Sequence, residues 1–564
     1  MDRIWLEHYP PGIPAQVDLG AFQTLKDLFE DSCRRFHDLP AFTNMGTSLT
    51  YGELERLSAQ FGAFLQKRAG LGPGARVAIM LPNLLQYPVA LFGTLRAGLT
   101  VVNVNPLYTA RELRHQLHDS GAQAIVVLEN FAHTLQEVLP DTAVQTVITT
   151  GLGDMLGLPK ALLVNFVARH VKHMVPHWHI EGAFDWKQVM EQGAQQRLDA
   201  VPLQRDDLAF LQYTGGTTGV AKGAMLSHGN MVANLLQTSA WIGGVLREGV
   251  EIAVTPLPLY HVFSLTANAL FFLKWGANNH LITNPRDTEG FIKEIKHLRF
   301  TAITGVNTLY NALLNAPSIG EVDAGALKLT VAGGMAVHRS VAQRWQETMG
   351  VPIIEGYGLT EASPIVCANP LDAKEFSGTV GLPLPSTDIS IRSESGEELG
   401  LNEVGELCVR GPQVMKGYWN QPAETARALT PDGWLHTGDM ALVNARGCVQ
   451  IIDRKKDLII VSGFKVYPNE VEEVAAMHPG VLEAGAIGVP DAHSGEVVKL
   501  FVVPKDPALT EAALLEHCRQ HLTAYKVPRQ VELRTATLPK TPIGKVLRRA
   551  LRDEDAARRS APTA

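Results

Sequence analysis

The chain has 564 residues, 46% of them hydrophobic and 19% charged, a composition typical of a folded protein that is too long for one core. Its formal net charge of -7 argues against nucleic acid as the main partner. The five cysteines are scattered and form no CxxC pair, so we expect reduced thiols in a cytoplasmic protein and no zinc site. The start, MDRIWLEHYPPGIP, lacks a basic stretch followed by an apolar core, and no signal peptide is expected.

The first part of the chain alternates short apolar runs with helical patterns. RVAIML is a predicted strand before a helical stretch, QYPVALFGTLRAG, and AIVVLE is a predicted strand after a helical ARELRHQLHDSG. The uncharged stretch 77–95 has the length of a membrane span, but its prolines and polar residues favour a buried strand, a turn and a helix. The alternation returns around TAITGV and KLTVAGG, which predicts at least two sheets before residue 350.

The segment 159–175, PKALLVNFVARHVKHMV, is predicted to form a basic amphipathic helix. Apolar side chains share one face and basic side chains lie off it: Leu163, Val167, Val171 and Met174 against Arg169, Lys172 and His173. Two interpretations stay open. The helix packs on its own domain, or it lies peripherally on the anionic inner face of the cytoplasmic membrane.

A polar loop rich in glycine and threonine, QYTGGTTGVAKGAML, occupies residues 212–226. Glycines allow close approach of the backbone to a ligand, and hydroxyls and an ammonium suit phosphate oxygens. The spacing differs from the Walker pattern, because Lys222 comes three residues after Gly219 and is followed by GAMLSH, a predicted strand. The residues alone leave two alternatives, a flexible turn and a strand-loop-strand hairpin that holds a polyphosphate.

Further residue types that suit a nucleotide recur along the chain. EGYGLTEASP carries Tyr357, which can stack on adenine, and Glu361, which can hold Mg²⁺. GWLHTGD ends at Asp439, which can accept hydrogen bonds from ribose hydroxyls, and Arg454 suits ribose or phosphate. Lys545 follows a glycine in a turn before a helix. Each piece alone is explained equally well by a turn or a surface charge, but their joint occurrence favours a nucleotide site.

The pattern of the chain changes twice after residue 350. From about 375 to 450 glycines are frequent and strands are short, as in GELCVRG and GCVQIID, which predicts a small β-rich subdomain. A charged run, DRKKD, at 453–457 marks a predicted domain boundary. Beyond it EVEEVAAMHPG and TEAALLEHCRQHL are predicted helices, and AGAIGVP and KLFVVP are predicted strands.

Seven motifs in this order resemble those of the adenylate-forming superfamily of acyl-CoA synthetases, adenylation domains and luciferases. They are YTGGTTGVAKGAMLSH, PLPLYHVFS, GYGLTEASP, GELCVRGPQVMKGYW, GWLHTGD, DRKKDLIIVSGFKVYPNEVE and PKTPIGKVLRR. The resemblance extends over nearly the whole chain. Four less specific stretches, LPNLLQYPVALFGTLRAG, NVNPLYTARELRHQL, LITNPRD and FTAITGVNTLYNALLN, are most similar to bacterial long-chain fatty-acyl-CoA synthetases.

The resemblance implies an α/β fold with two domains. The large N-terminal domain (1–452) consists of stacked α/β sheets and a small β-rich subdomain. A hinge (453–458) joins it to a small, mobile α+β C-terminal domain (459–564). The resemblance further implies ATP-dependent activation of a long-chain fatty acid through an acyl-adenylate, with Mg²⁺ as cofactor, coenzyme A as co-substrate, and AMP and pyrophosphate as products. Such an acyl-CoA would feed lipid metabolism, β-oxidation included.

Several alternatives to this function stay open. A medium-chain, aryl-acid or luciferase-like enzyme belongs to the same superfamily, and a catalytically silent binding regulator to a different class. LPLYHVFSL lacks the carboxylate with which amino-acid-activating relatives bind an ammonium, which favours a plain acyl substrate. Apolar residues of 260–273 and 303–314 are candidates for the acyl pocket, with core packing as the simpler explanation. The choice between a monomer and a homodimer is not decided by the sequence.

The resemblance also implies roles for individual residues. The expected catalytic residues are Thr214, His261, Glu361 and Lys545, with Thr214 and Glu361 at the metal. The expected phosphate-binding loop consists of Thr214, Gly215, Gly216, Thr217, Thr218, Gly219 and Lys222. The expected adenine pocket and its flanks consist of Gly333, Gly334, Glu355, Gly356, Tyr357, Gly358 and Thr360, with Asp439 and Arg454 at the ribose. Rotation at Asp453 would withdraw Lys545 and bring the loop of Gly463 to the thiol channel.

Overall fold

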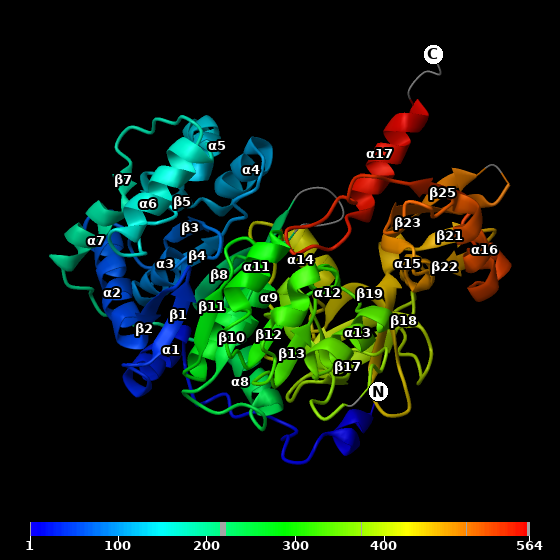
Figure 1. Cartoon of the computed structure of the whole chain (residues 1–564). Coiled ribbons are helices and arrows are strands. Elements are labelled where there is room, and N and C mark those ends of the chain that lie inside the picture. Colours follow the sequence, from blue (N-terminus) through cyan, green and yellow to red (C-terminus); the bar gives the residue numbers. More distant parts are fainter. Residues whose placement is uncertain (1, 215–220, 374, 492, 561–564) are drawn as a thin grey trace.

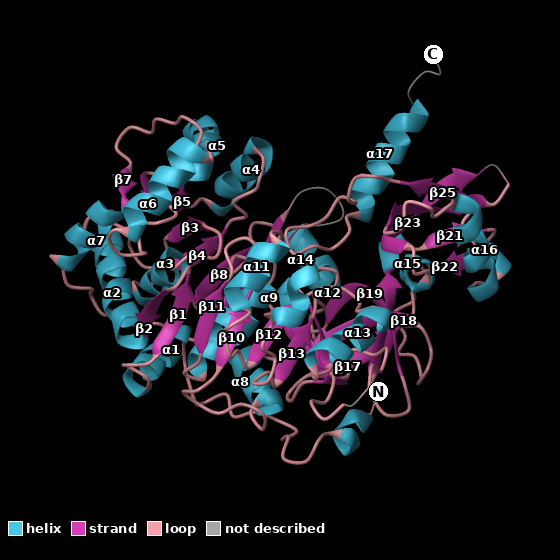
Figure 2. Ribbon diagram, in the orientation of Figure 1, coloured by secondary structure: helices cyan, strands magenta, loops and turns pink. Residues whose placement is uncertain are grey.

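The computed structural model describes residues 2–214, 221–373, 375–491 and 493–560. Figure 1 shows a large N-terminal domain and, at the right, a small C-terminal domain in orange and red. Figure 2 shows that strands form the interior of the large domain and that helices cover them. The α/β architecture with three sheets before the C-terminal domain agrees with the predicted fold class.

The first sheet of the large domain has seven strands in the order β7-β6-β5-β3-β4-β8-β9. The strands are β7 (Phe184–Asp185), β6 (Thr146–Thr150), β5 (Ala124–Leu128), β3 (Arg76–Met80), β4 (Thr100–Asn103), β8 (Leu208–Thr214) and β9 (Lys222–Ser227). All neighbours are parallel except β8 and β9, which form an antiparallel hairpin. Parallel strands that are covered on both faces have continuous apolar sequences. The apolar runs RVAIML and AIVVLE therefore predict strands correctly.

The second sheet has nine strands in the order β16-β15-β14-β13-β12-β10-β11-β1-β2. They are β16 (Leu382–Pro383), β15 (Ile365–Ala368), β14 (Ile353–Gly358), β13 (Leu329–Ala332), β12 (Ala302–Gly305), β10 (Ile252–Thr255), β11 (Asn278–Leu281), β1 (Pro40–Asn44) and β2 (Thr47–Thr50). The six strands from β14 to β1 are parallel, and antiparallel strands close both edges. The predicted pair of sheets before residue 350 is therefore confirmed.

Several helices start at side-chain caps that the sequence encodes. Each of α1 (Leu25–Arg35), α2 (Tyr51–Lys67), α4 (Ala110–Ser120), α7 (Trp186–Ala194) and α8 (His228–Ile242) begins with a capping box, in which two exposed backbone donors gain partners. The other α-helices of the large domain are α3 (Gln86–Arg96), α5 (Ala132–Val138), α6 (Lys160–Phe166), α9 (Val262–Ser264), α10 (Phe271–Lys274), α11 (Thr288–Ile295), α12 (Asn307–Leu314), α13 (Arg339–Met349) and α14 (Pro422–Ala428).

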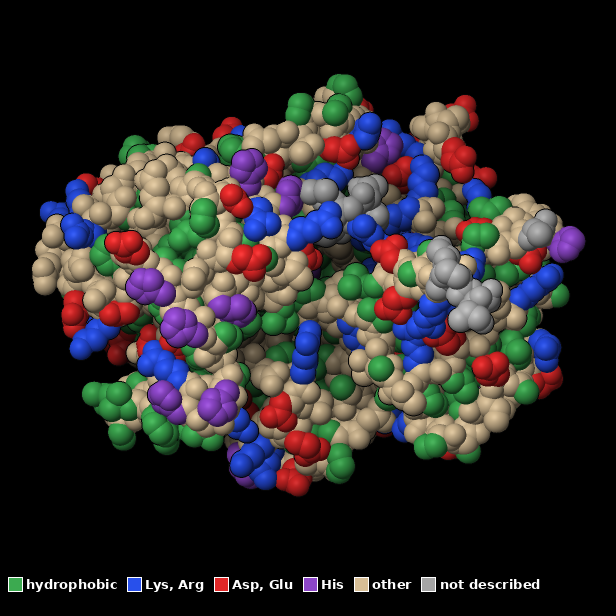
Figure 3. Space-filling model, turned by 90° about the horizontal axis from the view of Figure 1, so that it is seen from above, with side chains coloured by type: hydrophobic (Ala, Val, Ile, Leu, Met, Phe, Trp, Pro, Cys, Tyr) green, Lys and Arg blue, Asp and Glu red, His purple; other side chains and the backbone are tan. Residues whose placement is uncertain are grey.

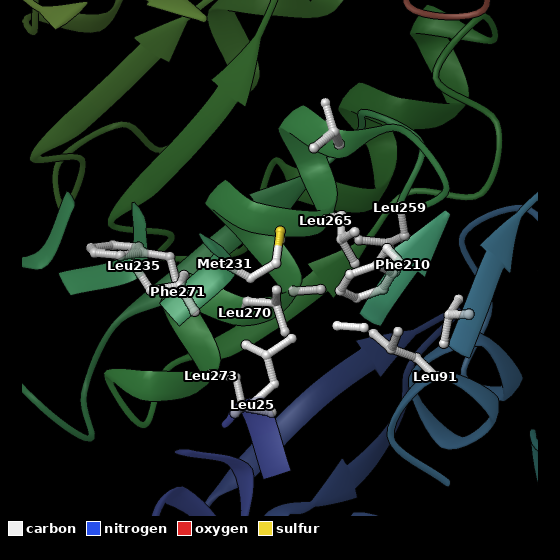
Figure 4. Close-up of a cluster of buried hydrophobic side chains, with 14 of the residues drawn as sticks. Leu25, Leu91, Phe210, Met231, Leu235, Leu259, Leu265, Leu270, Phe271 and Leu273 are labelled. Carbon is white, nitrogen blue, oxygen red and sulfur yellow. The ribbon is translucent and has the colours of Figure 1, made fainter. Parts of the chain in front are cut away.

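The main hydrophobic core joins the two sheets. Figure 4 shows Leu25 of α1, Leu91 of α3, Phe210 of β8 and Leu235 of α8 packed in one cluster. Every residue of α3 is buried, so the uncharged stretch 77–95 is a strand, a turn and a core helix as predicted. The Asn83 amide donates to three backbone carbonyls of the second sheet region and so ties the turn after β3 to that sheet.

The β-rich subdomain is an antiparallel sheet of β17 (Asp388–Arg392), β18 (Gly405–Arg410), β19 (Leu435–Val443) and β20 (Val449–Arg454). The C-terminal domain contains β21 (Ile459–Val461), β22 (Phe464–Val466), β23 (Val481–Asp491), β24 (Gly495–Pro504) and β25 (Gln530–Leu533) with α15 (Pro468–Met477), α16 (Glu511–His521) and α17 (Arg548–Ser560). The large domain contacts the C-terminal domain through α12 and the residue that follows it. Thr308 Oγ1 of α12 donates to the Gly544 carbonyl at 3.1 Å, and the amide oxygen of Asn315, just after α12, accepts from Lys505.

The segment 159–175 is helical only as far as Val171, as α6 followed by one π-helical turn. The helix attaches to its domain through Ala168, which is buried, and Asn165, which donates to Asp154. The predicted apolar face is therefore not the packed face. Leu163, Val171 and Met174 of that face are 50% to 63% exposed, and three further apolar residues, Leu158, Leu162 and Phe166, are 57% to 78% exposed. Within the described part of the chain, no helix is both long and apolar enough to cross a bilayer.

Candidate nucleotide and acyl site

A cavity of about 2460 Å³ lies between the large domain, the β-rich subdomain and the C-terminal domain. It exceeds the size of a single small-molecule pocket, and therefore has room for more than one substrate. The sequence-predicted residues that line it are Thr214, Lys222, His261, Gly333, Gly334, Glu355, Gly356, Tyr357, Gly358, Thr360, Glu361, Asp439, Arg454 and Lys545. Gly215, Gly216, Thr217, Thr218 and Gly219 lie outside the described residues. Figure 3 shows Lys and Arg side chains gathered near the centre of the face seen from above, as expected for a site that binds anions.

The two stems of the glycine loop are held by one helix. Thr214 and Lys222 are opposed in the ladder of β8 and β9, which confirms the predicted strand after the loop. On α4, Asp119 accepts a hydrogen bond of 2.5 Å from the Tyr213 hydroxyl, and the ring of His115 contacts the Ala221 carbonyl at 2.9 Å. The ends of the loop are thus fixed next to the cavity by contacts from α4.

The Lys222 ammonium has a protein partner, which the sequence did not reveal. It pairs with Glu424 and lies 4.9 Å from the centre of the Tyr418 ring. The Tyr418 hydroxyl in turn donates to Glu361 Oε1 at 2.7 Å. This chain of contacts brings the end of β8 and Glu361 to one side of the cavity. Tyr418 carried no predicted role, although it lies in the motif GELCVRGPQVMKGYW.

The side chains around Glu361 show whether this part of the cavity could bind the expected Mg²⁺. Among the residues described here, no group of three or more His, Cys, Asp or Glu side chains could hold a metal ion. Mg²⁺ in nucleotide sites is usually bound by one or two carboxylates together with substrate phosphates. Glu361 has one oxygen engaged by Tyr418 and lines the cavity, so its donor set fits an ion that arrives with a polyphosphate.

Asp439 is the centre of a buried polar cluster at the floor of the cavity. Its Oδ2 accepts a hydrogen bond of 2.6 Å from the Tyr357 hydroxyl, and its Oδ1 pairs with Arg454 Nε at 2.9 Å. The carboxylate is only 5% exposed. Three predicted nucleotide-binding residues from β14, β19 and β20 are thereby held in one rigid group, since charge-assisted hydrogen bonds are short and directional.

Lys545 enters the cavity from the C-terminal domain. Its turn is closed by the Thr541 hydroxyl, which accepts from the Lys545 backbone N–H at 3.1 Å. Burial, together with the positive charge of Arg454, lowers the pKa of Lys545 to about 8. A lysine with this pKa near Asp439 and Arg454 can present a positive charge to a phosphate at neutral pH.

The expected adenine wall is built from close backbone contacts. A Cβ at Gly333 would lie 3.2 Å from the Phe263 ring and 3.3 Å from the Gly356 carbonyl oxygen, and Gly334 has a φ of +77°. Both positions therefore favour glycine. Glu355 is buried beside them and its Oε2 accepts from the Val337 N–H at 3.3 Å. Burial raises the pKa of Glu355 to about 8, so this carboxyl is mostly neutral at pH 7 and can donate a hydrogen bond.

His261 lies where the cavity turns from polar to apolar. Its Nδ1 accepts from the Phe263 backbone N–H at 3.3 Å and caps α9. Burial lowers the pKa of His261 to about 4, so the ring is neutral at physiological pH. A catalytic role for His261 stays a prediction, and in this structure it is a neutral hydrogen-bonding group at the cavity wall.

Part of the cavity lining is apolar, and we call this part the apolar arm. Most of its residues come from α8, the segment 262–274 and strands β13 to β15. Its lining residues include Trp241, Ile242, Ala267, Phe271, Phe272, Leu329, Val331, Ile354, Ile365, Ala368 and Leu384. The arm is suited to a long uncharged chain, whose burial is favourable by about 0.8 kcal/mol per CH₂.

The second predicted acyl segment, 303–314, does not line this arm with apolar side chains. Ile303, Tyr310, Leu313 and Leu314 belong to a separate hydrophobic core. The same segment contributes polar side chains to the cavity, among them Asn307 and Thr308. Most of its large apolar residues therefore belong to the core, which is the simpler explanation of the sequence pattern, whereas Ala312 lines the cavity.

Among the described residues, Gly463 is the predicted site residue that does not line the cavity. It forms the turn between β21 and β22, with a φ of +84°, and is exposed. Asp453, by contrast, lies at the cavity edge near the end of β20, and the sheet of the C-terminal domain begins six residues later at Ile459. This arrangement has Lys545 in the cavity and the Gly463 turn outside it.

The fold is that of the adenylate-forming enzymes. The family model of the AMP-binding enzymes matches residues 29–419, and the model of the AMP-binding enzyme C-terminal domain matches residues 470–545. The chain belongs to the AMP-binding enzyme family.

Similar proteins cover the whole length of the chain. It is 54% identical to a long-chain-fatty-acid–CoA ligase from Salmonella typhimurium over 98% of both chains, and 52% identical to one from Haemophilus influenzae over 99% of this chain and all of the relative. Among solved structures, ATP-bound MatB from Rhodopseudomonas palustris has a TM-score of 0.80 at 28% identity, covering 94% of this chain and 98% of MatB. An anthranilate CoA ligase, AuaEII, in complex with anthranoyl-AMP, has a TM-score of 0.84 at 24% identity over 96% and 98%, which supports the fold.

Proposed function

We propose that this protein is an ATP-dependent long-chain fatty-acid–CoA ligase that acts through an acyl-adenylate. The observation that carries this proposal is that one cavity combines the apolar arm, which includes Trp241, Phe271 and Phe272, with a lining of nucleotide-type residues. Relatives with more than half of their residues identical over nearly their whole length are long-chain-fatty-acid–CoA ligases. Apolar lining would also suit a medium-chain or aryl acid, and it is these relatives that favour a long chain.

The proposed first half-reaction joins the fatty acid to AMP. The carboxylate oxygen attacks the α-phosphorus of ATP, the bond to the β-phosphate oxygen breaks, and pyrophosphate leaves. Lys545 would stabilise the negative charge that develops on the α-phosphate, while Asp439 and Arg454 hold the ribose. Positioning and charge neutralisation supply most of the catalysis in such transfers. Mg²⁺ bound at Glu361 and Thr214 would neutralise further phosphate charge.

The proposed second half-reaction releases the product. The sulfur of coenzyme A attacks the acyl carbonyl, a carbon–sulfur bond forms, and the bond to AMP breaks. In this structure Lys545 lines the cavity and the Gly463 turn does not, which supports an arrangement suited to the first half-reaction. Rotation of the C-terminal domain at Asp453 would exchange the two, with 453–458 as the hinge between domains 1–452 and 459–564. Conformational steps of this kind commonly separate two chemical events.

An assay across acid chain lengths tests the proposal. The purified protein is incubated with ATP, Mg²⁺, coenzyme A and straight-chain acids from 6 to 20 carbons, and AMP and pyrophosphate are measured separately. We expect both products to form in equal amounts with an optimum among the long chains. An optimum at medium chains or with benzoate would assign the alternative activity of the same family. Absence of turnover with every acid would overturn the enzyme function.

We also propose a peripheral contact of the α6 surface with anionic phospholipid at the inner face of the membrane. Leu162, Leu163 and Phe166 are each more than half exposed on this helix. Lys172 follows the π-helical turn Val167–Val171 that continues α6, and it is exposed, which gives the surface an apolar centre and a cationic edge. Arg169 has its charge committed to Glu129 through contacts of 2.7 to 3.1 Å, so it adds less to the attraction than the sequence suggested. Figure 1 shows α6 at the far side of the large domain from the C-terminal domain, so membrane contact would leave the cavity mouth free.

A further inference from the structure

A buried ion cluster joins Lys545 to the domain boundary. Its centre is Arg548, the first residue of α17, whose side chain is 11% exposed. The guanidinium forms a two-bond pair with Glu472, with Nε at 2.8 Å and Nη2 at 2.6 Å from the carboxylate oxygens. Its Nη1 donates to Asp453 Oδ1 at 2.8 Å, and Asp457 lies 3.5 Å away. Buried charges are retained at low cost only when their partners are placed in this way.

The partners of Arg548 belong to different parts of the molecule. Glu472 lies on α15 of the C-terminal domain and would move with Arg548 in any rotation of that domain. Asp453 lies on β20, in register with Met440 of β19, and is 1% exposed. The Arg548–Glu472 pair is therefore internal to the C-terminal domain, whereas the Arg548–Asp453 contact joins that domain to the first residue of the proposed hinge. The Asn469 backbone N–H also donates to Asp453, at 2.7 Å from Oδ2.

Lys545 is linked to this contact by a short, tight connection. Two residues separate it from Arg548, and the turn between them is fixed by the Leu547 N–H, which donates to the Pro539 carbonyl at 2.8 Å. On the other side of Lys545, the Gly544 carbonyl accepts from Thr308 of the large domain. The backbone on both sides of Lys545 is therefore held by hydrogen bonds. Lys545 loses less conformational freedom on binding a phosphate than it would on a mobile loop.

We propose that Arg548 is a positioning residue that couples Lys545 to Asp453 and so supports the adenylation half-reaction but not the thiol transfer. The inference rests on the proposed function, because it assigns Lys545 to the first half-reaction. Its physical basis is that a contact made in one domain arrangement alone shifts the equilibrium toward that arrangement by the free energy of the contact. A change of Asp453 removes this contact but keeps the Arg548–Glu472 pair. We therefore expect the C-terminal domain of such a variant to stay folded.

The test compares the two half-reactions in Arg548→Gln, Arg548→Lys and Asp453→Asn. Adenylation is measured as pyrophosphate release without coenzyme A, and thiol transfer as acyl-CoA formation from added acyl-adenylate. We expect Arg548→Gln and Asp453→Asn to slow adenylation by about 10- to 100-fold, the usual range of a state-dependent contact. Thiol transfer should stay within about threefold, and Arg548→Lys, which keeps the charge but not the planar fork, should lie between wild type and Arg548→Gln in adenylation.

Arg558→Gln is the matched control, because Arg558 lies on the same helix and pairs with Glu532 at 2.7 Å, far along the chain from Lys545. It should leave both half-reactions unchanged. Equal losses in both half-reactions, or unchanged adenylation in a folded Asp453→Asn variant, would overturn the positioning role. A wild-type protein that releases no pyrophosphate with any acid would instead refute the proposed function, so the two failures are distinguishable.

Discussion

Asp439 and Arg454 are partners in two ways. Their Cα atoms are opposed in the ladder between β19 and β20, and their side chains form an ion pair of 2.9 Å on the cavity side of that ladder. A pair built on adjacent, hydrogen-bonded strands keeps its geometry without a ligand. The ribose end of the proposed ATP site is therefore preorganised, and its binding costs little ordering.

The first prediction concerns this pair. Asp439→Asn removes the charge that Arg454 and the Tyr357 hydroxyl engage, and a hydrogen bond to a charged group contributes about 1.5–3 kcal/mol. We expect the KM for ATP to rise by about 10- to 100-fold, while the chain-length profile stays the same. Asp432→Asn, at an exposed position just before β19, is the control. An ATP KM within twofold of wild type in Asp439→Asn would contradict the assignment.

The second prediction separates the two half-reactions at Lys545. Lys545→Ala removes a cation from the cavity, and one lost charge-stabilising contact typically slows the chemical step by about 10²- to 10³-fold. We expect pyrophosphate release to fall by this factor, whereas conversion of added acyl-adenylate to acyl-CoA stays close to wild type. Survival of both half-reactions at wild-type rates would show that Lys545 has another role.

The third prediction is a pH dependence at the same residue. Burial and the charges of Arg454 and Arg548 lower the pKa of Lys545 to about 8, against the opposing influence of Asp439 and Asp457. The ammonium is present below this pH and is lost above it, so kcat/KM for ATP in the adenylation step should fall about tenfold per pH unit above about 8. Lys545→Arg keeps its charge, and its profile should lack this alkaline decrease. A decrease of the same shape in Lys545→Arg would assign the titration to another group.

The fourth prediction concerns chain length. Trp241 borders the apolar arm, with its Nε1 donating to the Asn369 carbonyl at 3.1 Å and its ring edge-on to Tyr9 at 5.3 Å. Trp241→Ala enlarges the arm, and each further CH₂ that it admits adds about 0.8 kcal/mol of binding. We expect the optimum of the chain-length series to move to longer acids, with a smaller change in Trp241→Phe. An unchanged optimum in a folded Trp241→Ala variant would place the end of the acyl chain elsewhere.

The fifth prediction tests the α6 surface. The double variant Leu162→Asp, Leu163→Asp places two charges at its apolar centre, and burying one leucine contributes about 1.5–3 kcal/mol. Sedimentation with phosphatidylglycerol vesicles should therefore decrease at least about tenfold, and Lys172→Glu should make the remaining binding weaker and less sensitive to salt. Val250→Asp changes an exposed apolar residue elsewhere and should have no effect. Equal sedimentation of all variants would contradict the membrane contact.

Much of the fold was predictable because its parallel strands are buried and apolar and its helices carry their own caps. The order of the nucleotide motifs was also readable from the sequence. Contacts between distant segments were not: Tyr418 reaches Glu361 across 57 residues, and Arg548 reaches Asp453 across 95. Hydropathy could not distinguish 260–273, which contributes several side chains to the apolar arm, from 303–314, most of whose large apolar residues lie in a separate core, because both segments are apolar.

The hairpin of β19 and β20 has a consequence for protein engineering. It carries the proposed ribose-binding pair and ends at the boundary of the C-terminal domain, so we expect a splice inside it to damage substrate binding and the domain connection at once. Chimeras that exchange C-terminal domains between such ligases should be joined after Asp457, before β21 begins. Because Asp453 would then come from the recipient and Arg548 from the donor, exchange partners are best chosen so that this acid–guanidinium pair is restored across the junction.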